Sequence, residues 1–369
     1  MEQNVKEQLL SIIKCFKISG TPAYVEEIKS GHINGTFVVT CLEDARRYVL
    51  QRINISIFKD YEGLMNNIEA VTSFLREKYE KAGLVDSNRR TLNVIRTANS
   101  DSLFHVDESG CVWRVYDFVT DATCYQVVES SDMFRKVGCA FGGFQRDLSD
   151  FDASVLIETI PNFHNTRNRF ENFMASVKAD KVGRLSTVKA EVEFVLDREE
   201  LCSYIVDKIA AGRLPLRVTH NDTKLNNIMV DDATGEGICV IDLDTVMPGS
   251  VLYDFGDSIR FGASSAAEDE TDLDKVYMRE EMFEAYAEGF VGALNGSLSE
   301  EEVLDLPMGA IIITLETGIR FLTDYLDGDT YFRTEYPEHN LDRARNQFKL
   351  VRDMEGKLAG MIETIKKFI

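Results

Sequence analysis

The spacing of apolar positions divides the chain into a first third that favours strands and a remainder that favours helices. Near the N-terminus, apolar residues recur at helical spacing among charged ones, which predicts an amphipathic helix packed on the body (Leu9, Leu10, Ile12, Ile13 and Phe16). Short β-branched runs predict strands at residues 25–28, 37–40, 47–53 and 112–119. Helical periodicity then prevails from about residue 121, as at residues 130–147, 167–181, 198–211 and 308–326.

The length of 369 residues exceeds that of one ordinary domain, so the pattern predicts two lobes. The first would be a small β-rich lobe over residues 1–119 that includes the N-terminal helix. The second would be a larger, mainly helical lobe over residues 120–369. The apolar strand at 112–119 ends in a polar turn, which places the expected hinge near residues 116–121.

Composition narrows the class of protein. A formal charge of -21 argues against partners such as nucleic acid or an anionic membrane surface, because both require basic patches. The seven cysteines are scattered singly, which indicates reduced thiols and a cytoplasmic enzyme. The N-terminal segment lacks the features of a signal peptide, and no run of about 18 apolar residues predicts a membrane span. No protein partner is implied.

The segment 217–246 contains the most specific pattern: His220, Asp222, Lys224 and Asn227 in order, then Asp242 after an apolar strand. This spacing is typical of enzymes that transfer a phosphoryl group from ATP, and coincidence of five elements is improbable. Asp222 would orient and deprotonate the acceptor hydroxyl. Asn227 and Asp242 would supply the oxygen ligands that Mg²⁺ prefers.

The residues around this pattern allow alternative interpretations. Lys224 could offset charge on the transferring phosphate, although an exposed loop lysine is often only solvated. His220 is interpreted as a structural hydrogen-bonding residue. Asp254 belongs to an Asp-Phe-Gly triplet, but we interpret it as a carboxylate that caps a helix beginning near Asp257. Asp244, if the chain is extended there, would point the same way as Asp242 and add a second metal contact.

Two earlier segments are candidates for nucleotide binding. The turn between the first two strands contains Gly31, His32, Asn34, Gly35 and Thr36, and its glycines would let backbone N–H groups approach phosphate oxygens. Taken alone, such a turn is usually an ordinary hairpin. At the expected hinge, the main chain around Asp117 and Val119 would bind adenine, whereas Trp113 is expected in the core.

The strand at 47–53 departs from the kinase pattern because it has no lysine. Either Gln51 or Arg52 must replace that lysine, and strand alternation places the two on opposite faces. The helix at 64–81 could supply Glu69 or Glu77 as a partner, although a solvated helix face explains both. The choice between Gln51 and Arg52 stays open.

Several longer motifs extend these observations: THNDTKLNNIMVD, VIDLDTVMPGSVLYDFGDSIRFGA, FQRDLSDFDAS with IPNFHNT, and ETGIRFLTDYLDGDTYFRTEYPEHNLDRARNQF. With them the chain resembles the aminoglycoside phosphotransferase and choline kinase superfamily, and within it the N-acetylhexosamine 1-kinases. The resemblance implies an α+β, two-lobed, protein-kinase-like fold with ATP and Mg²⁺ in the cleft. It further implies phosphorylation of the anomeric C1 hydroxyl of GlcNAc or GalNAc, in a pocket lined by Phe261, Arg320, Tyr331 and Phe332.

Two other function classes remain open. Another kinase of the superfamily would act on homoserine, choline, ethanolamine or an aminoglycoside, and cationic acceptors would need a cavity lined mainly by Asp and Glu. A nucleotide-binding regulator with weak activity is suggested only by the missing strand lysine. The lining of the acceptor cavity discriminates between the kinases, and turnover discriminates the regulator.

Overall fold

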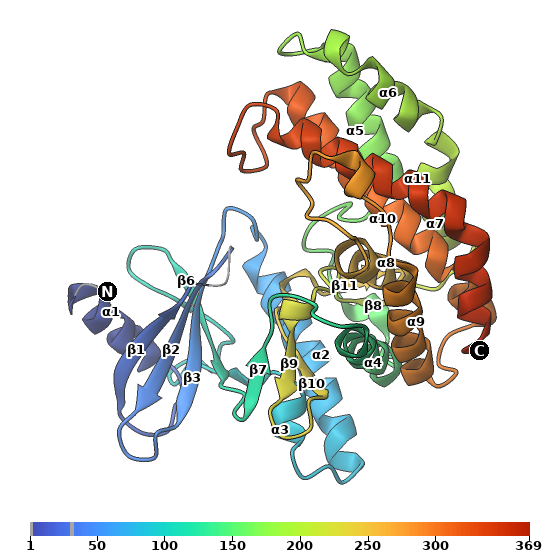
Figure 1. Cartoon of the computed structure of the whole chain (residues 1–369). Helices are drawn as coiled ribbons and strands as arrows, with labels where there is room; N and C mark the ends of the chain where they lie inside the picture. The colour runs from blue at the N-terminus through green and yellow to red at the C-terminus, as the bar shows by residue number, and fades with distance from the viewer. Residues whose placement is uncertain (1–2, 30–32) are drawn as a thin grey trace. The chain divides into compact units, whose positions relative to one another are not determined.

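The computed structural model describes residues 3–29 and 33–369. The chain forms two compact units, coloured along the sequence in Figure 1. The first comprises Met1–Thr123, Val155–Ile160 and Met229–Met247, and the second comprises Cys124–Ser154, Pro161–Ile228 and Pro248–Ile369. The first unit therefore takes in a late hairpin in addition to the N-terminal part of the chain. The lobe boundary at residue 119 stays a prediction.

An antiparallel sheet forms the framework of the first unit. Its strand order is β1-β2-β3-β6-β4, and β5 also pairs with β6. The strands span β1 (Pro22–Ile28), β2 (Gly35–Cys41), β3 (Arg47–Ile53), β4 (Val94–Ile95), β5 (His105–Val106) and β6 (Val112–Asp117). All of these pairings are antiparallel, and the registers of β2 with β3 and of β3 with β6 place residues from distant parts of the chain opposite one another.

The N-terminal helix α1 (Gln3–Ile13) covers this sheet, as its apolar spacing predicts. Leu9, Ile12 and Ile13 are buried in one cluster with Leu50 and Trp113 of the sheet. The amphipathic interpretation of α1 and the core interpretation of Trp113 are therefore confirmed. Two further helices belong to this unit: α2 (Tyr61–Lys81), capped by Asp60, and α3 (Ser87–Arg90).

Short strands surround the motif at 217–246. A three-stranded sheet has the order β10-β9-β7, and β8 pairs with β11. Their bounds are β7 (Ala122–Cys124), β8 (Arg217–Thr219), β9 (Ile228–Asp231), β10 (Gly237–Val240) and β11 (Met247–Gly249). Asn227 directly precedes β9, and Asp242 comes shortly after β10, so the β9–β10 hairpin separates the two predicted metal ligands in the sequence.

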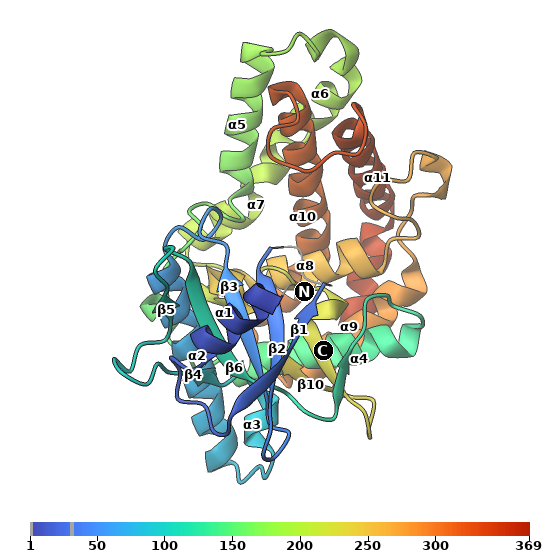
Figure 2. The ribbon, with the colours of Figure 1, turned by 90° about the vertical axis from the view of Figure 1, so that its left-hand side faces the viewer.

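The second unit is mainly helical, which confirms the α+β interpretation. Its helices are α4 (Ser131–Asp147), α5 (Thr166–Ala179), α6 (Lys189–Leu196), α7 (Glu199–Ala210), α8 (Val251–Gly262), α9 (Glu280–Leu294), α10 (Glu300–Asp327) and α11 (His339–Lys366). Helix α10 packs against α5, α8 and α11, and it lies beside α11 in both views of the ribbon (Figures 1 and 2). Most of the buried apolar side chains of α10 contribute to the core of this unit.

Helix α10 is longer than its sequence pattern predicts. A helix beginning at Met308 is wrong because a capping box between Ser299 and Glu302 fixes the start at Glu300. Pro307 therefore lies inside the helix. By length and composition α10 could cross a membrane, but 78% of its most apolar window is buried in the protein, as in a core helix.

The crossing of α8 and α10 is formed by backbone rather than by side chains. A Cβ atom on Gly256 of α8 would lie 2.4 Å from the carbonyl oxygen of Gly309 on α10. A Cβ atom on Gly309 would lie 2.3 Å from the carbonyl oxygen of Leu252. Only glycine permits this approach, because any side chain at either position would overlap backbone atoms.

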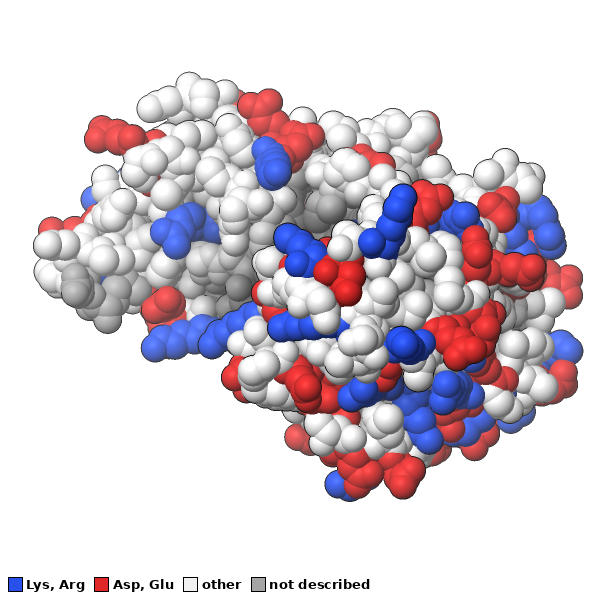
Figure 3. Space-filling model, turned by 90° about the horizontal axis from the view of Figure 1, so that it is seen from above, with Lys and Arg blue, Asp and Glu red and all other residues white. Residues whose placement is uncertain are grey.

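The charged side chains mix on the surface. On the face in Figure 3, Lys and Arg lie among Asp and Glu rather than forming one basic field. This distribution agrees with the net charge of -21, which leaves acidic groups in excess.

Candidate active site

The loop after β8 brings three residues of the sequence pattern together. The Lys224 ammonium lies 2.6 Å from a carboxylate oxygen of Asp222. The side-chain amide of Asn227 donates to the backbone oxygen of Asp222 at 2.8 Å and to its carboxylate at 3.2 Å. The Lys224 ammonium and the Asn227 amide thus hold the side chain of Asp222 in place within the loop.

The orientation of Asn227 suits a metal ligand. Its side chain is buried, and its NH₂ group faces Asp222. The amide oxygen, the atom that would bind Mg²⁺, is therefore not used in the contact with Asp222.

Lys224 retains its proton strongly. Burial lowers its pKa, but the negative charges of Asp222 and Asp257 raise it, and the net shift is upward. Asp257 is itself in a buried ion pair with Arg260 at 2.9 Å. Lys224 is consequently a fixed positive charge beside the proposed base.

Helix α8 anchors this loop through Asp254. Its buried carboxylate accepts hydrogen bonds from the backbone N–H groups of His220 and Asn221, at 2.9 and 2.8 Å, and from the side chain of Gln145 at 2.8 Å. Burial raises the pKa of Asp254, while His220 and these donors oppose the shift. The predicted capping role of Asp254 is wrong, because α8 begins earlier, with Ser250 as its cap.

His220 supports the loop from within the core. Its ring is buried against the edges of Phe141 and Phe144, and its Nδ1 accepts a hydrogen bond from the backbone N–H of Asp222 at 3.2 Å. This geometry agrees with the structural interpretation of His220 and places no proton-transfer role on it.

A second histidine, which the sequence did not single out, reaches the same loop. Nδ1 of His164 lies 2.9 Å from a carboxylate oxygen of Glu316, and the Thr166 hydroxyl donates to the other oxygen at 2.6 Å. Nε2 of His164 lies 3.5 Å from the backbone oxygen of Asn221. Helix α10, which carries Glu316, is thereby linked to the residue preceding Asp222.

Asp242 and Asp244 differ in exposure. Asp242 has a left-handed backbone (φ 57°, ψ 54°) and begins the short 3-10 turn Leu243–Thr245. Its side chain is exposed, whereas Asp244 is buried. The prediction that Asp244 points the same way as Asp242 is wrong, because that prediction assumed an extended chain and the chain turns here instead.

The carboxylate of Asp244 forms an ion pair with a buried arginine. A guanidinium nitrogen of Arg114 on β6 lies 2.5 Å from its carboxylate, and the amide of Asn34 donates to the carboxylate at 2.6 Å. Burial lowers the pKa of Arg114, but the charges of Asp244 and Tyr116 and the hydrogen bond to Asp244 together raise it above its ordinary value. Asp244 is therefore a partner of Arg114 and Asn34, and its role as a second metal ligand stays a prediction.

Arg114 also settles which cation lies beside β3. It is opposite Gln51 in the strand register, and its Nε donates to the Gln51 side chain at 3.0 Å. Gln51 donates in turn to the Thr36 hydroxyl at 3.0 Å, whereas Arg52 is exposed. The buried cation thus comes from the neighbouring strand, and its only signal in the sequence is a single Arg within an apolar run.

The predicted helix partners of the strand cation are engaged elsewhere. Glu69 pairs with Arg96 at 2.6 Å, and Glu77 lies 3.4 Å from Lys81 on an exposed helix face. Neither is a described partner of Gln51 or Arg52; the solvated-face interpretation agrees with the exposed Glu77, whereas Glu69 is partly buried in its ion pair with Arg96.

The remaining nucleotide candidates lie in the first unit. Gly31 and His32 fall outside the described residues, while Gly35 and Thr36 begin β2. Asp117 ends β6, where its backbone N–H donates to Asn93 at 3.1 Å. Val119 follows as a buried residue. Their roles toward phosphate and adenine stay predictions.

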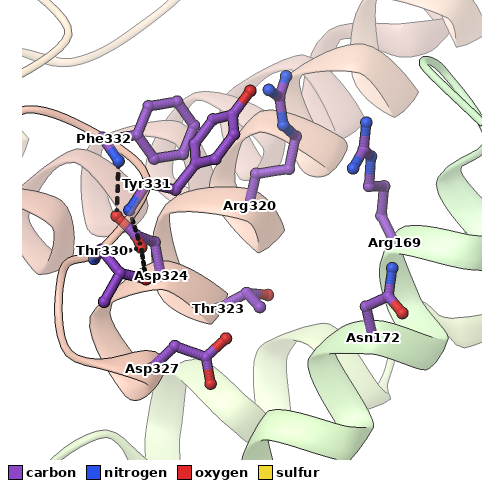
Figure 4. A pocket seen from close by; sticks show the side chains of 9 residues that line it. All are labelled: Arg169, Asn172, Arg320, Thr323, Asp324, Asp327, Thr330, Tyr331 and Phe332. Carbon is purple, nitrogen blue, oxygen red and sulfur yellow. Dashed lines mark hydrogen bonds between the residues drawn. The ribbon is translucent and has the colours of Figure 1, made fainter. Parts of the chain in front are cut away.

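A pocket of about 190 Å³ lies between α5 and the C-terminal part of α10 (Figure 4). Three of the four predicted acceptor residues line it: Arg320, Tyr331 and Phe332. Phe261 does not, and its side chain on α8 is 47% exposed. The other lining residues are Arg169, Asn172, Thr323, Asp324, Asp327 and Thr330.

Asp324 holds in place the aromatic wall of this pocket, which consists of Tyr331 and Phe332. Its carboxylate accepts hydrogen bonds from the backbone N–H groups of Tyr331 and Phe332, at 2.8 and 2.9 Å, as drawn in Figure 4. The Arg320 guanidinium lies 5.9 Å and 5.5 Å from the centres of these two rings. The turn is thus held in place, and the arginine is stacked on it.

Comparisons with known proteins find a matching family and similar solved structures. Residues 25–288 match the model of the phosphotransferase enzyme family. Among solved structures, the chain is similar to a choline kinase from Cryptosporidium parvum (12% identity, TM-score 0.58, covering 98% of this chain and 99% of that one). It is also similar to an aminoglycoside phosphotransferase from Alicyclobacillus acidocaldarius (11% identity, TM-score 0.58, covering 97% and 96%).

A third similar structure is a spectinomycin phosphotransferase in complex with ADP and spectinomycin (14% identity, TM-score 0.53, covering 97% and 98%). At these identities the likeness concerns the fold alone. The family match covers more than half of the chain and rests on its sequence. The chain therefore belongs to the phosphotransferase enzyme family.

Proposed function

We propose that this phosphotransferase transfers the γ-phosphoryl group of ATP to the anomeric C1 hydroxyl of an N-acetylhexosamine, GlcNAc or GalNAc, and releases the sugar 1-phosphate. The observation that carries the proposal is the lining of the pocket beside α10, where Arg320 is stacked on Tyr331 and Phe332. Sugars present C–H faces to aromatic rings and hydroxyls to charged donors, so this wall suits a sugar.

The pocket is less suited to a cationic acceptor. Two guanidinium groups line it, from Arg169 and Arg320. Of its two carboxylates, Asp324 is occupied by backbone N–H groups, which leaves Asp327 as the carboxylate without such bonds among the described residues. A choline, ethanolamine or aminoglycoside acceptor would meet two carboxylates that are balanced by two guanidinium groups, rather than the excess of Asp and Glu that a cation needs.

Asp222 would be the base. It would accept the proton of the acceptor hydroxyl as the oxygen attacks phosphorus and the bond to the ADP oxygen breaks. Lys224, which keeps its proton, would release Asp222 and turn to the transferring phosphate. A general base of this kind contributes about 10²–10⁴-fold to the rate.

Mg²⁺ would be bound by the amide oxygen of Asn227 and the carboxylate of Asp242. Both are hard oxygen donors, and Mg²⁺ in nucleotide sites commonly takes only one or two protein ligands together with phosphate oxygens and water. When bound, the ion would neutralise charge that develops on the β- and γ-phosphates. Asp244, paired with Arg114, is not part of this ligand set.

The test is a panel of acceptors incubated with Mg-ATP: GlcNAc, GalNAc, glucosamine, glucose, homoserine, choline, ethanolamine and an aminoglycoside. We expect ADP release and a phosphorus NMR signal coupled to the anomeric proton with the two N-acetylhexosamines. Preferred phosphorylation of an amino alcohol would contradict the proposed acceptor. No ADP release with any acceptor would favour a regulatory protein.

A further inference from the structure

Helices α5 and α10 run beside each other and present matching residues turn by turn. The first contact is the hydrogen bond from Thr166 to Glu316, at 2.6 Å. One turn later along each helix come Arg169 and Arg320, and both line the pocket. Asn172 and Thr323 follow after a further turn and also line it. Figure 4 shows the two guanidinium groups at one end of this pocket and Asp327 at the other.

The guanidinium groups of Arg169 and Arg320 have N–H donors that no described residue accepts. Neither forms an ion pair with a carboxylate in the part of the chain that the structure describes. Arg169 donates to the backbone oxygen of Phe163 at 2.8 Å, and its buried Nε has no hydrogen-bond partner. Arg320 contacts the faces of two aromatic rings, which leave the edge of its guanidinium plane for a ligand.

Two of the nearby carboxylates are already bound, and the third, Asp327, lies at the other end of the pocket (Figure 4). Glu316 is held by His164 and Thr166, and Asp324 by backbone N–H groups. The positive charge of Arg320, together with burial, lowers the pKa of Arg169, while Glu316 and Tyr331 act in the opposite direction. Two like charges therefore face one pocket with an unfilled demand for acceptor oxygens.

We propose that Arg169 and Arg320 together form a subsite for the acyl carbonyl oxygen of an N-acylated amino sugar, and that this subsite excludes the free amine. An amide carbonyl carries two acceptor lone pairs, which can take one donor from each guanidinium. A protonated amine offers only donors and adds a third positive charge. The subsite rests on the proposed function and assigns Arg169 as the residue that separates N-acetylglucosamine from glucosamine.

The chain offers a matched set of variants on one helix. Arg169→Gln removes the charge, whereas Arg169→Lys keeps it and loses the planar fork. Arg167→Gln is the control, because Arg167 lies on the same helix, pairs with Glu171 and Glu199 at 3.2 and 3.0 Å, and does not line the pocket. Each variant is compared with the wild type by kcat/KM for N-acetylglucosamine and for glucosamine.

In the wild type we expect a preference of at least about tenfold for the N-acetyl sugar, since a lost charged hydrogen bond costs roughly 1.5–3 kcal/mol. Arg169→Gln should reduce that preference by about tenfold or more on the same basis. Its KM for ATP and the midpoint of its thermal unfolding should stay at wild-type values. Arg169→Lys should still discriminate against glucosamine, and Arg167→Gln should match the wild type.

An unchanged preference in Arg169→Gln, with N-acetylglucosamine still phosphorylated, would overturn the subsite and leave the proposed function intact. A wild type that phosphorylates neither GlcNAc nor GalNAc would overturn both. Direct binding of the two sugars by calorimetry, with a non-hydrolysable ATP analogue present, separates recognition from turnover. An equal loss of affinity for both sugars in Arg169→Gln would also contradict the carbonyl assignment.

Discussion

Two arginine clusters, one in each unit, differ in what surrounds the charge. Arg114 in the first unit is 1% exposed and is paired with Asp244, Gln51 and the ring of Tyr116. Arg320 in the second unit lines an open pocket with Arg169 and pairs with no carboxylate among the described residues. An arginine whose donors are used within the protein supports the fold, whereas one whose donors are unused is available to a ligand.

The largest expected effect concerns Asp222, which belongs to neither arginine cluster and serves as the reference for the smaller effects below. Asp222→Asn removes the proposed base and leaves the loop contacts of Asn227 nearly unchanged in shape. We expect kcat to fall by about 10²–10⁴-fold, because general base catalysis contributes that much. Mg-ATP affinity, measured by calorimetry, should remain. Turnover near the wild-type level would remove Asp222 from the mechanism.

The next prediction concerns stability, and it tests whether Arg114 and Arg320 differ in how much they stabilise the fold. Arg114→Ala leaves the Asp244 carboxylate buried without its cation, which typically costs about 3–5 kcal/mol. Urea unfolding should show this loss, while Arg320→Ala, at the wall of an open pocket, should change the free energy of unfolding by less than about 1 kcal/mol.

A paired variant sharpens the assignment for Arg114. Arg114→Met combined with Asp244→Leu should recover most of the stability, because both charges are then absent. Equal losses in Arg114→Ala and Arg320→Ala would show that the two arginines do not differ in the way their surroundings imply.

A third expectation concerns substrate binding by Arg320. In Arg320→Ala we expect the KM for the sugar to rise by about tenfold or more, as for the loss of a charged hydrogen bond. The KM for ATP should change by less. Steady-state kinetics with each substrate varied in turn gives both values, and the reverse pattern would move Arg320 out of the acceptor site.

The smallest effect depends on pH. His164, Thr166 and Arg320 outweigh burial and lower the pKa of Glu316 below its ordinary value of 4.5. The ionised carboxylate therefore stabilises the fold above pH 4.5, and this contribution is lost as the pH falls through the lowered pKa. The difference in Tm between the wild type and Glu316→Gln should narrow on acidification. A difference that is constant from pH 7 to well below pH 4.5 would contradict it.

The contacts within the loop after β8 were largely predictable because the information for them is local. Asp222, Lys224 and Asn227 lie within a few residues, so the spacing that suggests their chemistry also determines their contacts. The helical and strand-rich regions follow from periodicity for the same reason. The start of α10 does not follow from apolar periodicity, because a capping box of Ser299 and Glu302 fixes it and Pro307 lies inside the helix.

Long-range pairing explains what the sequence could not show. Arg114 meets Gln51 only through the register of β3 with β6, and no local pattern contains that register. Asp244 turns inward because Asp242 adopts a left-handed conformation. Arg169 lies within a helix that was predicted, but its position opposite Arg320 depends on how α5 and α10 pack.

The glycine contact between α8 and α10 limits how this enzyme can be altered. Helix α8 holds the Asp222 loop through Asp254, and α10 carries Arg320, so the crossing at Gly256 and Gly309 sets the spacing between the proposed base and the proposed acceptor wall. A methyl group at either glycine would force α8 and α10 apart, and it would displace the Asp222 loop and Arg320 together. Engineering for new acceptors has most freedom at the far end of α10, from Arg320 to Asp327, where side chains rather than backbone line the space.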